Sequence, residues 1–148
     1  MRFKFPFLTL LKQRKVEEEL ARRDFLTAQS KVNEQLAKIN GMWSEIEEAR
    51  EKAAQLQHNG GRTTVFLSFV DSFICGQLVR IERSKDSLRE LMMVAEQKRE
   101  ILVEAAKQYK ILQKLEERQV KAFNAKKKKK EMKDIDNMVV MRFQRGVR

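Results

Sequence analysis

The sequence has 148 residues, of which 36% are charged, while only one is proline and five are glycine. So many charges and so few turn-forming residues exclude a loop-rich globule and indicate long helices or a coiled coil. Because a coiled coil buries mainly one narrow face, it encloses little volume for a substrate. The composition therefore argues against an enzyme.

The formal net charge of +11 is concentrated at the two ends of the chain. Residues 1–15 contain five basic and no acidic residues (+5), and residues 121–148 contain ten basic and three acidic residues (+7), which leaves −1 for residues 16–120. Basic ends favour an acidic partner, whether nucleic acid, anionic lipid or an acidic protein surface. The charge alone does not choose among them.

Cysteine content and hydropathy predict a soluble, cytoplasmic protein. The single Cys75 excludes an internal disulfide and a cysteine zinc site, and we expect it to be a buried or half-buried thiol. Residues 5–11 are too short an apolar run for a signal peptide. The longest stretch without Lys or Arg lies between Arg62 and Arg80; it has 17 residues and contains Asp71, so we predict no membrane span.

A first helix is predicted over about residues 6–57. Pro6 suits a first helical turn, because its φ is fixed and its missing N–H is not needed there. From Phe25 onward, apolar residues at alternating steps of three and four form the heptad seam of a coiled coil. The seam consists of Phe25, Ala28, Val32, Gln35, Ile39, Met42, Ile46, Ala49, Ala53 and Leu56. Gly41 lies inside this helix, where it costs about 1 kcal/mol relative to Ala, and it permits a local bend or a close approach of a neighbour.

A turn is predicted at residues 58–63, where Asn59, Gly60 and Gly61 tolerate the left-handed backbone that ends a helix. Thr63 or Thr64 is expected to cap a second helix over about residues 64–143. A second heptad seam runs along this helix. It consists of Leu67, Val70, Ile74, Gln77, Ile81, Ser84, Leu88, Leu91, Ala95, Lys98, Leu102, Ala105, Tyr109 and Leu112.

The predicted fold is thus all-α, a single domain formed by a long antiparallel two-helix hairpin. At about 1.5 Å per residue the first helix spans about 75 Å and the second nearer 120 Å. Pairing outward from the turn brings residues near Phe7 beside residues near Leu115. Residues 115–148 are therefore expected to project as a basic overhang, with the N-terminus near its root.

Catalytic and cofactor motifs are not found in the sequence. It has one histidine, His58, and no glycine-rich phosphate loop, zinc-protease motif or nucleophile elbow, so we predict no enzymatic activity, cofactor or metal. The run Lys126–Lys130 points around a helix in all directions and does not form a groove-reading face, so no specific nucleic-acid partner is expected. The apolar residues that follow it indicate a surface that binds another protein.

A second candidate surface lies at the start of the second helix. Phe66, Phe69 and Phe73 are spaced at i, i+3 and i+7 on a face that misses the seam. They either widen the core near the turn or form a docking patch whose aromatic side chains anchor a partner. Both interpretations are open at this point.

Two end signatures accompany the two-helix pattern. These are Phe3–Leu11 leading into Glu17–Glu19, and Glu131–Met138 running on to Arg142 and Phe143. With these signatures, the whole chain resembles the FliJ family of flagellar type III export proteins. The resemblance implies a non-enzymatic antiparallel coiled coil similar to the central stalk of rotary ATPases. It also implies a cytoplasmic location, peripheral to the inner membrane at the flagellar base, and roles in flagellum biogenesis and motility.

The resemblance further implies three partners: a hexameric export ATPase, the cytoplasmic domain of the transmembrane export gate, and export chaperones. Carried onto this sequence, the expected contacts with the ATPase ring are Phe7, Leu11, Ile135, Met138, Arg142 and Phe143. Phe66, Phe69 and Phe73 are the candidate contacts with the gate or with clients. Two alternatives are a generic coiled-coil scaffold or chaperone that uses the phenylalanines, and a nonspecific nucleic-acid binder that uses the basic tail.

Overall fold

The computed structural model describes residues 2–59 and 64–146, and within these ranges it contains two α-helices and no strand. Helix α1 is Leu8–His58 and helix α2 is Thr64–Gly146. The two helices pack against each other, which confirms the predicted all-α helical hairpin. The predicted ranges were 6–57 and 64–143, so α1 begins two residues later than expected and α2 ends three residues later.

The beginning of α1 differs from the prediction because Pro6 lies in a turn that precedes the helix. The Leu8 N–H donates to the Phe5 carbonyl over 3.3 Å, and the Leu11 N–H donates to the Phe7 carbonyl over 2.9 Å. The Phe7 carbonyl thus accepts the first helical hydrogen bond, which makes Phe7 the N-cap residue. At the other end, the Asn59 N–H still donates to the Gln55 carbonyl over 3.1 Å. Residues 60–63, with the predicted turn glycines and Thr63, lie outside the described residues.

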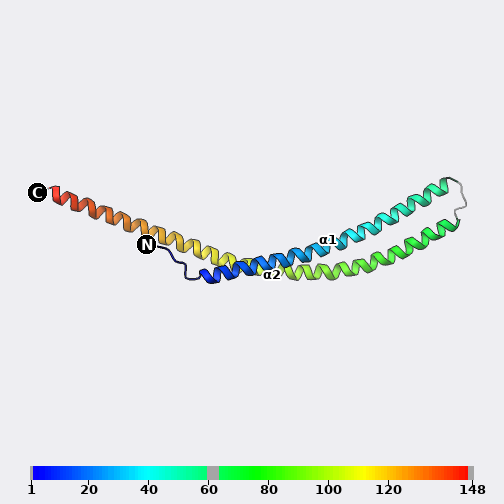
Figure 1. Cartoon of the computed structure of the whole chain (residues 1–148), viewed down its shortest axis with the longest axis horizontal. Coiled ribbons are helices and arrows are strands. Elements are labelled where there is room, and N and C mark those ends of the chain that lie inside the picture. The colour runs from blue at the N-terminus through cyan, green and yellow to red at the C-terminus, as the bar shows by residue number, and fades with distance from the viewer. Residues whose placement is uncertain (1, 60–63, 147–148) are drawn as a thin grey trace. The chain divides into compact units, whose positions relative to one another are not determined.

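The chain divides into two structural units. Unit 2 is Leu20–Leu102 and unit 1 combines Met1–Glu19 with Val103–Arg148, so both helices contribute to both units. In unit 2, α1 and α2 run antiparallel and side by side (Figure 1). Its core is a single seam between the two helices, because two helices alone leave every other face in water.

The core of unit 2 consists of two clusters of apolar side chains. One joins Ala28 and Val32 of α1 to Ala95 of α2, and the other joins Ile39 and Ile46 to Ile81. Every predicted seam residue from Phe25 to Leu56, and every one from Leu67 to Leu102, is buried or half-buried. The heptad pattern therefore identified the packed face of both helices.

Polar residues within the seam are hydrogen-bonded across it. The side-chain amide of Gln35 donates to the Ser84 carbonyl over 3.0 Å. The amide of Gln77, which is only 2% exposed, donates to the Glu45 carboxylate, and its oxygen accepts from Arg80 over 3.5 Å. These bonds satisfy groups that are otherwise costly to bury.

Unit 1 includes an aromatic segment that precedes α1 and contacts α2. Phe5 is 7% exposed, and the Phe3 ring lies 5.5 Å from the Phe123 ring of α2, centroid to centroid. The Phe5 and Phe7 rings meet edge to face with their centroids 5.9 Å apart. Beyond Phe123, all residues from 124 to 146 are exposed although they remain helical.

One part of α2 is apolar enough to cross a membrane by length and composition. An 18-residue window of this helix has a mean hydropathy of 1.4, and 11% of it is buried. Val70 and Gln77 nevertheless lie buried in the seam against α1, which is the packing of a helix in a hairpin. This window is weak evidence for a membrane span.

Candidate protein-interaction surfaces

The first candidate surface is the exposed end of α2, residues 124–146, called the tail surface below. Its large apolar side chains are between 54% and 74% exposed. They are Met132, Ile135, Met138, Val139, Val140, Met141 and Phe143. Isolated exposed apolar residues are ordinary, but this many in three helical turns indicate a surface that another molecule covers.

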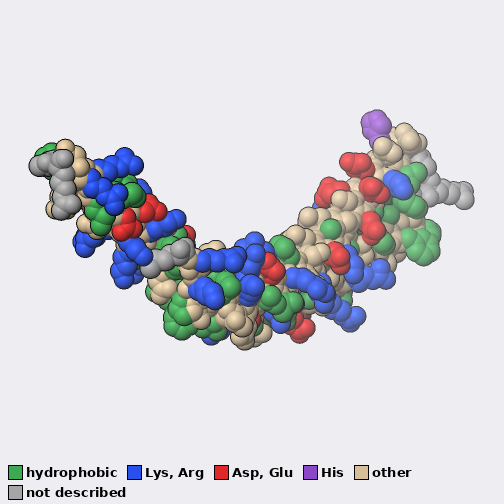
Figure 2. All heavy atoms as spheres, turned by 60° about the vertical axis from the view of Figure 1, so that its left-hand side comes forward, with side chains coloured by type: hydrophobic (Ala, Val, Ile, Leu, Met, Phe, Trp, Pro, Cys, Tyr) green, Lys and Arg blue, Asp and Glu red, His purple; other side chains and the backbone are tan. Residues whose placement is uncertain are grey.

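The tail surface is also strongly basic. Residues 124–146 contain eight basic and three acidic residues, which gives 8 − 3 = +5. Lys127 Nζ lies 4.0 Å from a Glu131 carboxylate oxygen, a long i to i+4 ion pair that is half-exposed and therefore weak. Figure 2 shows Lys and Arg side chains beside hydrophobic ones near the C-terminal end of α2. The surface thus suits a partner that is both apolar and acidic.

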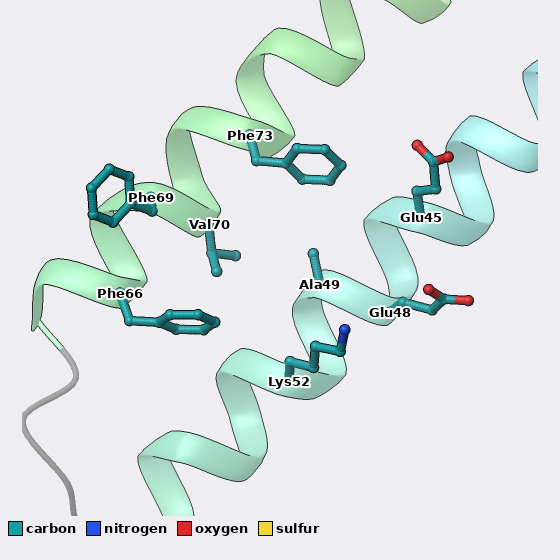
Figure 3. Close-up of a pocket in the computed structure, with 8 residues that line it drawn as sticks. All are labelled: Glu45, Glu48, Ala49, Lys52, Phe66, Phe69, Val70 and Phe73. Atoms are coloured by element: carbon teal, nitrogen blue, oxygen red, sulfur yellow. The ribbon is translucent and has the colours of Figure 1, made fainter.

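The second candidate surface is a groove of about 340 Å³ in unit 2, called the phenylalanine groove below. Figure 3 shows that the rings of Phe66 and Phe73 point toward α1 on either side of Val70, whereas Phe69 turns away from α1. The three phenylalanines are 39%, 69% and 40% exposed in chain order. The two interpretations left open by the sequence thus apply to different side chains: Phe66 and Phe73 face α1, as in a widened core, whereas Phe69 faces away from it.

The opposite wall of the phenylalanine groove is charged. It consists of Glu45, Glu48, Ala49 and Lys52 of α1. The Gln77 side-chain amide donates a hydrogen bond to the Glu45 carboxylate, and this bond restrains the Glu45 side chain at the rim of the groove. Acidic side chains also gather over this end of α1, near His58 (Figure 2). The groove therefore combines aromatic anchors with a charged rim, as protein-binding sites commonly do.

The structure also locates the expected N-terminal contacts. Phe7 is 46% exposed and packs on Phe5, whereas Leu11 is half-buried. The contact of Phe3 with Phe123 attaches the N-terminal segment to α2 directly before the tail surface begins. Arg142, like the rest of the tail surface, is exposed.

The packing of Phe3 and Phe5 was not predicted, although both residues belong to the N-terminal signature. Their signal was the alternation of Phe3, Phe5 and Phe7, whose period of two is typical of extended backbone rather than helix. The charged wall of the phenylalanine groove was not predicted either, since acidic residues on α1 have the pattern of an ordinary solvent-exposed helix face. The expectation for Cys75 was wrong: this thiol is exposed, because it follows Ile74 and so lies about 100° away from the seam.

No arrangement for catalysis is found in the part of the chain that the structure describes. These residues contain no group of three or more His, Cys, Asp or Glu side chains that could hold a metal ion. The pKa of the Glu96 carboxyl is lowered, because the Arg99 guanidinium donates hydrogen bonds to it, the shortest over 2.7 Å. This pair is exposed on the surface of one helix, where such i to i+3 pairs are common.

Comparison with known proteins agrees with the architecture. A model of the family described as flagellar FliJ protein matches residues 3–148. The chain belongs to the FliJ family. It is therefore a component related to flagellar protein export. No curated protein and no solved structure matches the chain.

Proposed function

We propose that this FliJ-family protein couples the hexameric export ATPase to the export gate and also binds export chaperones. One observation carries the proposal: α2 continues beyond Phe123 as a helix whose every residue to Gly146 is exposed. A bare helix with apolar and basic side chains has the form of an insert for the pore of a ring. The protein then resides in the cytoplasm at the inner face of the membrane, at the flagellar base.

The physical mechanism follows from a mismatch of symmetry. A single helix has no sixfold axis, so at any moment it contacts the subunits of a hexamer differently. Subunits that bind it more tightly in one conformation are shifted toward that conformation. Ile135, Met138 and Phe143 provide apolar anchors for this contact, and Arg142 provides a charge.

The phenylalanine groove is the proposed second contact, either with the gate's cytoplasmic domain or with a chaperone. Exposed aromatic side chains dominate the energetics of many interfaces, because they bury a large area at a small cost in side-chain entropy. Phe66 and Phe73 border the groove and Phe69 extends outward from it. A helix or extended segment of the partner fits such a site.

ATP hydrolysis by the cognate export ATPase tests the ring contact. We expect the full chain to stimulate hydrolysis, and a truncation ending at Lys121 to lose most of the stimulation. The full-length double variant Met138→Gln, Phe143→Gln is expected to lose it as well. Measuring at two salt concentrations separates apolar from electrostatic contributions, since salt screens only the latter.

The matched control is the double variant Met92→Gln, Met93→Gln, which changes side chains that are 53% and 65% exposed but lie outside the tail surface. It should stimulate like the unmodified chain. If the tail variant and the control stimulate equally, the ring contact is elsewhere and the coupling role fails.

Binding of the purified gate domain and of chaperones tests the phenylalanine groove. We expect Phe69→Ala with Phe73→Ala to weaken binding at least about tenfold, as loss of two aromatic anchors usually does. Val94→Ala, at a side chain that is 45% exposed in the same unit, is the control. A general scaffold would instead bind clients through the phenylalanines while the tail variants behave normally in every assay.

A further inference from the structure

The tail surface has two chemically different faces. At about 100° per residue, four apolar residues fall within an arc of about 80° on the helix. They are Met132, Ile135, Val139 and Phe143, which are 65%, 54%, 60% and 74% exposed. Lys126, Lys130 and Lys133 lie on the opposite side of the same helix, together with Met141 and Asp134. A helix with an apolar stripe on one side and lysines on the other side resembles in composition the amphipathic helices that lie in a membrane interface.

The lysine run Lys126–Lys130 does not follow this two-sided pattern, and contact with a single protein groove would not use all five lysines. The five side chains Lys126–Lys130 project around the whole circumference of the helix, and all are exposed. A groove contacts one side of a helix, whereas lipid headgroups are mobile and rearrange around each ammonium group. The long lysine stems also allow ammonium groups on the apolar side to reach the headgroup layer.

We propose that the tail surface binds anionic phospholipid bilayers as an interfacial helix. Met132, Ile135, Val139 and Phe143 insert between the acyl chains, while Lys126–Lys130 contact the phosphate headgroups. The net charge of +5 on residues 124–146 complements the negative surface of such a bilayer. This interaction goes beyond the coupling role, because it requires neither the ATPase nor the gate. Since Ile135 and Phe143 are also proposed ring contacts, the bilayer and the ring are alternative occupants of the tail surface.

The structure favours a bilayer over nucleic acid as the occupant. Binding to a phosphate backbone alone would leave the apolar stripe in water. Single-stranded nucleic acid requires stacking platforms, yet residues 124–146 contain one aromatic residue, Phe143. A bilayer is the anionic partner that accommodates both faces of the helix at once.

Co-sedimentation of the full chain with vesicles tests this proposal. We expect binding to vesicles of phosphatidylcholine with phosphatidylglycerol, little binding to phosphatidylcholine alone, and weaker binding at high salt. Each lysine near an anionic surface strengthens binding about fivefold, so glutamine at all five positions of the lysine run should weaken it by about a thousandfold or more. Circular dichroism checks that this variant remains helical.

A charge-matched control removes five other exposed lysines, at positions 31, 38, 107, 110 and 114, and should bind nearly as the unmodified chain does. The apolar stripe is tested with Ile135→Gln and Phe143→Gln, which should weaken binding at constant charge. Val140→Gln with Met141→Gln, on other sides of the helix, should weaken it less.

Equal losses in the lysine-run variant and its charge-matched control would overturn the proposal, since net charge alone would then explain the binding. Binding to a DNA duplex without preference for anionic over neutral vesicles would also overturn it, in favour of a nucleic-acid partner. Because the vesicles contain no ATPase, failure here leaves the coupling role untouched, and failure of ATPase stimulation leaves this proposal untouched.

Discussion

Replacing Ile81 with alanine should destabilise the hairpin of unit 2 more than almost any other single truncation. Ile81 is 1% exposed and packs in a cluster with Ile39 and Ile46. Partly buried side chains from both helices, including Met42 and Ile74, surround this cluster. The substitution therefore removes contacts to both helices at once.

The expected magnitude follows from the atoms lost. Ile→Ala deletes three carbons, and at about 0.8 kcal/mol per buried carbon this costs about 2.4 kcal/mol. A cavity in a large core adds to such a cost, but the layer here is one seam thick and water reaches its borders, so the extra term stays small. We expect the free energy of unfolding to fall by about 2–3 kcal/mol and the melting temperature by about 5–10 °C.

Urea denaturation followed by circular dichroism measures this change. The control is Ile101→Ala in the same helix and the same unit, where the side chain is 56% exposed. It should alter the free energy of unfolding by no more than about 0.5 kcal/mol, because little area is buried and alanine favours helix. Equal effects of the two substitutions would refute the conclusion that seam burial stabilises unit 2.

Three further predictions concern single positions. Gly41→Ala should raise the free energy of unfolding by about 0.5–1 kcal/mol, because a Cβ there meets nothing within 4 Å; a loss of stability in thermal melts would reveal an unrecognised close approach. Gln77→Leu should stabilise the hairpin by about 1 kcal/mol, because the exposed Glu45 carboxylate that it releases can be hydrated instead. Sedimentation should also show more self-association of this variant, because a polar seam residue that specifies the register is lost. Arg99→Ala should raise the lowered pKa of Glu96 toward its usual value in an NMR titration. Since a lowered pKa stabilises the fold above the unfolded-state pKa and that stabilisation disappears as pH falls, the variant should lose slightly less stability on acidification.

The heptad pattern predicted the packed face almost completely, because burial in a two-helix layer depends on the period of the apolar residues alone. It did not predict the partners of polar seam residues. The bond from Gln35 to the Ser84 carbonyl depends on the longitudinal alignment of two helices, which the period leaves undetermined. For the same reason, the acid that accepts from Gln77 was not foreseen.

The candidate surfaces were predicted less completely. The sequence located Phe66, Phe69 and Phe73 off the seam but left their exposure open, since exposure depends on how closely α1 approaches. Of the two alternatives for Gly41, a local bend or a close approach, the close approach was wrong, because the structure leaves open space there. The tail surface was easier to predict, since no other part of the chain was long enough to cover it.

The polar bonds across the seam also determine how the two helices resist sliding. In one cluster, Ala28 and Ala95 present only a methyl group each, and Val32, Leu88 and Leu91 supply the larger side chains. A displacement of one helix by a heptad would again place apolar residues opposite apolar residues. It would, however, break the bond from Gln35 to Ser84 and the bond from Gln77 to Glu45. These two hydrogen bonds therefore oppose sliding of one helix along the other. A force applied along one helix is then transmitted to the other helix.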